Sequence, residues 1–316
     1  MDGRPRASAT STVQFIVTTI LRELVGNSQR LDGGAMFGNA PRALWSRWLS
    51  PDEENRVPLV CRTLLVQKGG RNLLFETGIG AFFDPKMKER YGVVEDEHVL
   101  LNSLAEAGLT HEDIHVVVLS HLHFDHAGGL LSKHQANTEP KLLFPNAQFV
   151  TSRTAFERCR SPHSRDRASF VPGLAEQLEQ SDRLTLVTAD QAPAVLGEGF
   201  EWFETDGHTP GMLHTQIQGQ VHDVTFAADL VPGTAWVHLP ITMGYDRFAE
   251  RVIEEKRALY DRLSPKQSWL FYTHDPNWSL SRIARDVKGR FAATDSISSL
   301  GSGWDLDSAQ TPASPR

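Results

Sequence analysis

The feature that most constrains this chain is a run of six residues, HLHFDH, that carries four side chains able to hold a metal ion. Residues 114–119, directly before it, are β-branched and apolar except for one histidine, as in a buried strand. The four side chains are therefore expected at the mouth of a strand, where Gly128 and Gly129 let the backbone turn closely behind them. They are His121, His123, Asp125 and His126.

The ligand types indicate which metal such a site would hold. Imidazole and carboxylate together favour zinc or a neighbouring metal, and the absence of thiolates argues against a structural zinc finger. The alternative is a surface cluster of polar residues without a metal. Three histidines and one aspartate at the spacing HxHxDH, at the end of a buried strand, favour the metal site.

Three further candidate ligands lie downstream, each at or just after a strand-like run. They are His208 in DGHTPG, Asp229 in AADL and His274 in FYTHD. Each is a weak signal alone, because a histidine at a strand end is often only hydrogen-bonded and an aspartate can cap a turn. Together with HxHxDH, their order predicts a site for two metals.

The rest of the chain alternates between the strand and helix periods. The expected strands are residues 59–67, 72–75, 114–119, 148–151, 200–204, 215–218, 224–227 and 269–272, and the expected helices include residues 97–107 and 248–263. Gly69 and Gly70 join the first two strands as a hairpin turn. Strands in two sets with helices outside them predict an α+β fold, a four-layer αββα sandwich.

The composition predicts one globular domain between two tails. The 316 residues are 40% hydrophobic and 22% charged, which is ordinary for a globular protein. Residues 1–11 and 296–316 are polar and are expected to be mobile tails. Because the candidate ligands spread over most of the chain between them, residues 12–295 are predicted to form a single catalytic domain.

Charge and targeting signals narrow the possible partners. The net charge of −7 and the lack of a basic run argue against a nucleic-acid partner. Two cysteines are too few for a disulfide framework. No secretory signal and no apolar run long enough to span a bilayer is found, so a cytoplasmic protein without a membrane partner is expected. Trp45 and Trp48 are candidates for a homodimer contact.

The order HxHxDH, GHTPG, AADL and a final histidine resembles the five-motif pattern of the metallo-β-lactamase superfamily, from about residue 31 to residue 277. The resemblance implies the metallo-β-lactamase fold and two divalent metal ions, with zinc expected. It implies that His121, His123 and His208 hold one metal, that Asp125, His126 and His274 hold the other, and that Asp229 bridges them. The family's first motif is usually Asp-Thr-Gly, and Glu76 stands here in place of that aspartate, as a candidate for orienting a ligand.

Four other stretches resemble the YtnP-type quorum-quenching lactonases within that superfamily. They are LDGGAMFG at residues 31–38, FPNA at residues 144–147, RSP at residues 160–162 and MGYD at residues 243–246. This closer resemblance implies a hydrolase of lactones or esters, with N-acyl-homoserine lactones as the leading substrate class.

Two metals close together lower the pKa of a bridging water, so a metal-bridging hydroxide is expected to attack the substrate carbonyl. Asp125 and Asp229 are the candidate catalytic residues. The acyl-homoserine lactonases that this chain resembles carry a tyrosine shortly after the bridging aspartate, and this chain does not. Tyr245 or His238 is the candidate replacement.

Met36 and Phe37, with Trp45 and Trp236, are candidates for an apolar wall that contacts an acyl chain, although each could simply pack in the core. Two other functions stay open. A phosphotriesterase resembling methyl parathion hydrolases would use the same ligands. A binding or regulatory module with weak turnover is the alternative from another class, and the complete ligand set argues against it.

Overall fold

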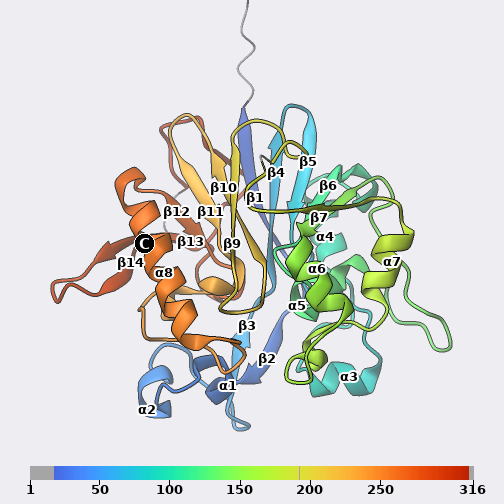
Figure 1. Cartoon of the computed structure of the whole chain (residues 1–316), viewed down its shortest axis with the longest axis horizontal. Coiled ribbons are helices and arrows are strands. Elements are labelled where there is room, and N and C mark those ends of the chain that lie inside the picture. The colour runs from blue at the N-terminus through green and yellow to red at the C-terminus, as the bar shows by residue number, and fades with distance from the viewer. Residues whose placement is uncertain (1–17, 192, 313–316) are drawn as a thin grey trace, which may run out of the picture.

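The computed structural model describes residues 18–191 and 193–312, so the tail predicted at residues 1–11 lies outside the described residues. Two large sheets face each other, and helices cover both outer faces (Figure 1). The predicted α+β, four-layer αββα sandwich is therefore confirmed. No helix within the described ranges is long and apolar enough to cross a membrane. The covering helices are α8 (Ala249–Leu263) on one side, and α4 (Val99–Glu106), α6 (Arg153–Arg160) and α7 (Leu174–Gln180) on the other.

The first sheet has seven strands in the order β15-β1-β4-β5-β6-β7-β8, and the second has six in the order β14-β13-β12-β11-β10-β9. The first comprises β1 (Thr19–Val25), β4 (Arg62–Lys68), β5 (Arg71–Phe75), β6 (Val116–Val118), β7 (Gln148–Ser152), β8 (Leu184–Val187) and β15 (Trp304–Asp305). The second comprises β9 (Phe200–Thr205), β10 (Met212–Gln218), β11 (Asp223–Phe226), β12 (Trp269–Phe271), β13 (Leu280–Arg285) and β14 (Phe291–Ile297). A small ribbon pairs β2 (Gln29–Asp32) with β3 (Arg56–Leu59), and the short helices are α1 (Gly33–Phe37), α2 (Arg42–Trp45), α3 (Pro85–Arg90) and α5 (Phe124–Ala127).

Side chains along β4 alternate between two cores, which explains why this strand is apolar on both faces. Leu64 and Val66 pack in the core that also contains Phe226 and Phe271 of the second sheet. Leu65, between them, packs in the other core, which lies under the outer helices of the first sheet. A strand covered on both sides has no polar face, so it appears in the sequence as a continuous apolar run.

The candidate ligands follow strands that end at one edge of the sandwich. β11 runs parallel to β12, and β9 has the same direction because both β9 and β11 are antiparallel to β10. His208, Asp229 and His274 come after β9, β11 and β12 respectively. In the first sheet, β6 leads into α5, which lies at the same edge, near β2 and β3 (Figure 1).

The strand predicted at residues 59–67 is two strands in the structure, and this corrects the sequence-based boundary. β3 ends at Leu59 and β4 begins at Arg62. Between them the chain leaves the ribbon and contacts the residues that follow β12 of the second sheet: the Val60 N–H donates to the His274 carbonyl (3.4 Å) and the Arg62 N–H to the Thr273 carbonyl (2.8 Å). The break brings the chain against a candidate ligand.

The expectation of a mobile tail from residue 296 is wrong as far as residue 312. β14 continues to Ile297, and β15 pairs antiparallel with β1 so that Trp304 lies opposite Leu21. Trp304 and Leu306 are buried in the core between the sheets. These two apolar side chains anchor a segment that is otherwise polar. The average composition of the segment therefore did not indicate that it packs on the domain.

Candidate metal centre

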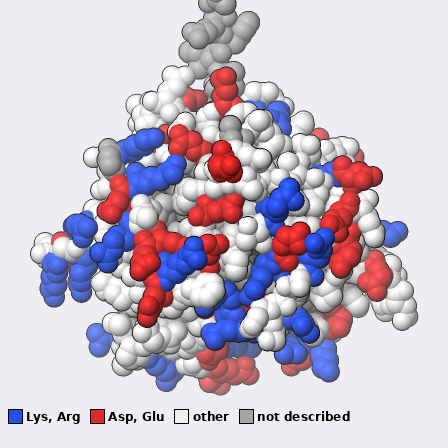
Figure 2. All heavy atoms as spheres, in the orientation of Figure 1, with Lys and Arg blue, Asp and Glu red and all other residues white. Residues whose placement is uncertain are grey.

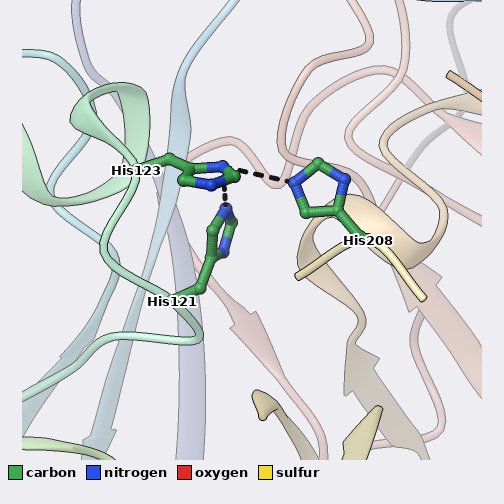
Figure 3. Close-up of side chains that lie close together, drawn as sticks. All are labelled: His121, His123 and His208. Atoms are coloured by element: carbon green, nitrogen blue, oxygen red, sulfur yellow. Dashed lines mark hydrogen bonds between the residues drawn. The ribbon is translucent and has the colours of Figure 1, made fainter. Parts of the chain in front are cut away.

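Three of the predicted ligands bring their ring nitrogens together at the edge of the sandwich. Figure 3 shows His121 and His123, from the loop after β6, facing His208 from the second sheet. His121 Nε2 lies 3.0 Å from His123 Nδ1, and His208 Nε2 lies 3.3 Å from the same nitrogen. All three side chains are buried.

Asp125, His126 and His274 form a second group beside the first. His126 Nε2 and His274 Nε2 are 3.2 Å apart. The Asp125 carboxylate lies 3.6 Å from His274 Nε2 and 3.8 Å from His126 Nε2. Asp125 and His126 lie in α5, which follows β6 of the first sheet, and His274 follows β12 of the second sheet.

Asp229 lies between the two groups and faces both. Its Oδ2 is 3.3 Å from His126 Nε2 and 3.3 Å from His208 Nε2, and its Oδ1 is 3.1 Å from His274 Nε2. The structure thus brings all seven predicted ligands together, with the Asp229 carboxylate in contact with a histidine from each group.

The donor set fits divalent cations. Two groups of three, His121 with His123 and His208, and Asp125 with His126 and His274, each offer ligand atoms within 4.8 Å of one another. A neutral imidazole has one donor and one acceptor nitrogen, so His123 Nδ1 cannot pair with both facing nitrogens by ordinary hydrogen bonds, whereas a shared cation can bind all three. His123 Nε2 is also buried and has no hydrogen-bond partner among the described residues. Nitrogen and carboxylate oxygen ligands of this kind are those that zinc and its neighbours take.

The electrostatics separate the histidines into two kinds. Burial, followed by the neighbouring histidines, lowers the pKa of His121 and His123 well below the usual range, so both rings are neutral near pH 7. Burial is the largest single effect on His126 and His274 and would do the same to them, but the neighbouring groups, Asp229 first among them, together outweigh it and hold their pKa well above the usual range. Those histidines in turn hold the pKa of Asp229 well below its usual range against the effect of burial. The ionised Asp229 therefore stabilises cations at both groups of candidate ligands.

Three of the inward-facing rings are held from behind by the other ring nitrogen. His208 Nδ1 is 2.9 Å from Asp246 Oδ1, and His274 Nδ1 is 2.8 Å from the Val60 carbonyl oxygen. His121 Nδ1 lies 2.8 Å from the Ser120 hydroxyl. Such contacts fix the tautomer and leave Nε2 to face the centre.

Glu76, the candidate for orienting a ligand, lies behind the centre and faces His126. Its Oε1 accepts a hydrogen bond from the Ser120 N–H (3.0 Å), and its Oε2 is 3.5 Å from His126 Nδ1. Its backbone has a φ of 65°, which turns the chain sharply after β5. The longer carboxylate can therefore reach both the strand end and a candidate ligand.

A cavity of about 190 Å³ opens over the centre. Its floor includes Asp125, Asp229 and His274, and its walls are mostly apolar. Tyr245 and Met36, both predicted to contact substrate, line it. The other wall residues are Leu31, Leu59, Tyr91, Phe124, Arg165, Ala168, Ser169 and Met243, and His123 and His208 complete the lining.

Two residues predicted at the substrate site do not line this cavity. Phe37 is fully buried behind Met36, stacked between Trp45 (5.5 Å between ring centroids) and Trp236 (4.7 Å). It supports the wall without contacting the cavity. His238 lines a different pocket, beside Trp48 and Trp278. Of the two candidates for the missing tyrosine, Tyr245 and His238, only Tyr245 is therefore positioned to contact a substrate.

Comparison with known families identifies this arrangement of sheets and ligands. A family model described as the metallo-beta-lactamase superfamily matches residues 56–274. The chain belongs to the metallo-β-lactamase superfamily. The expectation of a metal-dependent hydrolase of this superfamily is confirmed.

Solved structures share the fold over nearly the whole chain. A probable metal-dependent hydrolase from Staphylococcus aureus is 27% identical, with a TM-score of 0.77 over 88% of this chain and 98% of that one. AidC, a dizinc quorum-quenching lactonase with a product bound, is 21% identical, with a TM-score of 0.70 over 87% and 94%. Among curated proteins, an N-acyl homoserine lactonase of Bacillus sp. is 24% identical over 247 residues, 72% of this chain and 85% of the relative.

Sequence reasoning missed several residues of this superfamily member's site. Gln29, from the small ribbon, donates from Nε2 to Asp125 Oδ2 (3.0 Å), and nothing in its local sequence signals the contact. Asp246 lies in the MGYD stretch, so the resemblance marked the segment but not the role. Arg165 lines the cavity, although no sequence motif marked it as a site residue.

Proposed function

We propose that this chain is a dinuclear metal hydrolase that opens lactone or ester bonds, with N-acyl-homoserine lactones as the leading substrate class. The observation that carries the proposal is the position of Asp229, whose two carboxylate oxygens face both histidine groups. The lactonases among the relatives support the choice of substrate.

In this proposal His121, His123 and His208 hold one divalent metal, Asp125, His126 and His274 hold the second, and Asp229 contacts both. Zinc is the expected metal, because imidazole and carboxylate suit it and a dizinc lactonase shares the fold. When bound, the metals would supply Lewis acidity that polarises a carbonyl and makes hydroxide available at neutral pH.

The chain's own residues would bind the substrate and move a proton. Asp125 reaches the cavity, and Gln29 donates to its Oδ2, which holds the carboxylate in place. The carboxylate could take the proton that the attacking water loses and pass it to the leaving alkoxide. Tyr245 is 37% exposed as a residue, but the desolvation of its phenol at the cavity, followed by repulsion from Asp125, raises the phenol's pKa to about 12. The phenol therefore stays protonated and can donate to a substrate oxygen. The apolar wall with Met36 and Leu59 would contact the acyl chain and exclude water.

We also propose a cytoplasmic protein that acts on a small-molecule substrate. A homodimer stays a prediction, and of its two candidate contact residues only Trp48 is available, because Trp45 is 1% exposed.

The proposal is tested by an activity screen of the purified, metal-quantified protein. An N-acyl-homoserine lactone, a simple γ-lactone, paraoxon and a cephalosporin are compared side by side. We expect opening of the lactones. If only the phosphotriester is hydrolysed, the phosphotriesterase alternative replaces the proposal. If the metal-loaded protein hydrolyses none of the substrates, the protein is instead a binding or regulatory module.

A further inference from the structure

The cavity is too small to enclose a whole acylated lactone. The part of the substrate that does not fit inside must therefore extend over the rim of the cavity. Its volume of about 190 Å³ is below the roughly 300–1,000 Å³ of pockets that enclose drug-sized ligands. Of the lining residues, Arg165, Ala168 and Tyr245 are exposed and so form the rim. A group that extends from the reacting end of the substrate would meet these three side chains.

Arg165 has a positive charge that no carboxylate in the described structure neutralises. Its only side-chain hydrogen bond within the described ranges is a 3.4 Å donation from Nη2 to the Gly244 carbonyl. The adjacent acid, Asp166, is buried and accepts instead from Arg158, at 2.9 Å and 2.7 Å. The guanidinium of Arg165 is therefore free to bind an anion.

Arg247 places a second guanidinium, which has no ion pair among the described residues, next to the first. Within the same described residues its Nη1 is buried without a hydrogen-bond partner, while its Nε donates to the Tyr245 carbonyl (3.2 Å) and its Nη2 to the Asp246 carbonyl (3.5 Å). The neighbouring Asp246 carboxylate is already bound by His208 and by the Met243 N–H (2.7 Å). Burial, and then repulsion by Arg165, lower the pKa of Arg247, so the two guanidinium charges act on each other.

This concentration of positive charge contrasts with the rest of the protein. The chain carries a net charge of −7. Figure 2 shows Lys and Arg side chains gathered low on this face, between α8 and α6. Arg158 lies on α6, and Arg247 lies two residues before α8. Planar guanidinium groups match carboxylates in geometry and can bind them through two parallel hydrogen bonds.

We propose that Arg165, with Arg247 behind it, binds a carboxylate on the part of the substrate that projects from the cavity. The natural substrate would then be a lactone or ester that carries a negative charge away from the scissile bond. This inference rests on the proposed function and narrows its substrate class.

The kinetic test compares two N-acyl-homoserine lactones of equal length, one ending in a methyl group and one in a carboxylate. We expect the wild type to prefer the anionic substrate by about ten-fold in kcat/KM, mainly through KM, as a hydrogen-bonded charge pair predicts. Arg165→Gln should bring the ratio close to one, Arg165→Lys should keep part of it, and added salt should lower it. Arg167→Gln is the matched control, because Arg167 is an exposed arginine of the same loop that does not line the cavity; it should keep the wild-type ratio.

A binding measurement separates this inference from the proposed function. Calorimetric titrations compare a short dicarboxylate with its monomethyl ester, and the wild type should bind the diacid about ten-fold more tightly. If no lactone is opened but Arg165→Gln abolishes this difference, the proposed function fails and the anion site stands. If neutral and anionic ligands behave alike in the wild type, or if Arg165→Gln and Arg167→Gln are indistinguishable, the anion site is overturned.

Discussion

At the scale of single residues, the candidate ligands of this site were easier to identify from the sequence than the side chains that contact them from behind. The candidate ligands follow strand ends in recognisable short motifs. Asp246 contacts His208 across 38 positions of sequence, and no local pattern marks such a contact. Gln29 is a further example, since it reaches Asp125 from a different part of the chain.

Asp246→Ala removes the partner of His208 Nδ1 and the acceptor of the Met243 N–H. We expect metal affinity or kcat/KM to fall by about 10- to 100-fold, the usual cost of losing such an orienting contact. Chelator competition and steady-state kinetics measure the two quantities. Asp307→Ala is the control, because Asp307 also accepts backbone N–H bonds but from Thr19 and Gln220; equal losses in both variants would contradict a specific role for Asp246.

Glu76→Gln keeps an oxygen that can accept from the Ser120 N–H but removes the negative charge that faces His126. We expect metal affinity to fall about ten-fold, while stability without metal changes little. Metal titration and thermal unfolding of the metal-free variant separate the two effects. An unchanged metal affinity would mean that Glu76 acts only as a structural acceptor for Ser120.

At the scale of elements, buried apolar strands and the long amphipathic helix were predictable, and the strands rich in polar residues were not. Residues 114–119 predicted β6 because its three valines are covered on both faces. β13 and β14 have many half-buried or exposed positions and gave no such signal. In α8 the inner face was predictable, but Lys256 lies on it, fully buried, and helical spacing alone does not say that a lysine points inward.

Lys256 holds the segment that leads to Tyr245 and Asp246. Its Nζ donates to the carbonyls of His238 (3.1 Å), Leu239 (3.3 Å) and Ile241 (2.9 Å). Burial lowers its pKa to about 7, from an ordinary value of 10.5. Between these pH values the unfolded chain binds a proton that the folded chain does not, so this group makes stability rise with pH.

Lys256→Met should remove that pH dependence. As the pH rises from about 7 to 10.5, the unfolding free energy of the wild type should increase relative to that of the variant. The increase should be up to about 1.4 kcal/mol per pH unit. Urea unfolding at a series of pH values measures it. Lys266→Met changes an exposed lysine in the 3-10 turn that follows the same helix and should show no such slope. Parallel curves for wild type and Lys256→Met would disprove the buried titration.

At the scale of the whole molecule, the layer order could be predicted, but the end of the domain and the rim of the cavity could not. Two sets of strands with flanking helices leave few arrangements open. The rim depends on how the loop after α6 meets the segment before α8. Neither loop has a period that fixes its path, so Arg165 could not be placed from the sequence.

Trp304→Ala tests whether the segment after β14 belongs to the domain. Trp304 is 3% exposed and packs edge-on against Trp269, with ring centroids 5.7 Å apart. Its loss should lower the unfolding free energy by about 3–5 kcal/mol. Denaturant unfolding checks this, and Val287→Ala, at a fully exposed site, should change stability by less than about 0.5 kcal/mol. A mobile segment would make the two variants alike.

The central claim is that Asp229 joins two metal sites, and elemental analysis of the purified wild type and of Asp229→Asn tests it most directly. The account predicts about two divalent ions per wild-type chain, fewer in the variant, and at least about a 100-fold loss of lactone opening in the variant. A wild type without metal, or a variant that keeps both the metal content and the activity of the wild type, would contradict it.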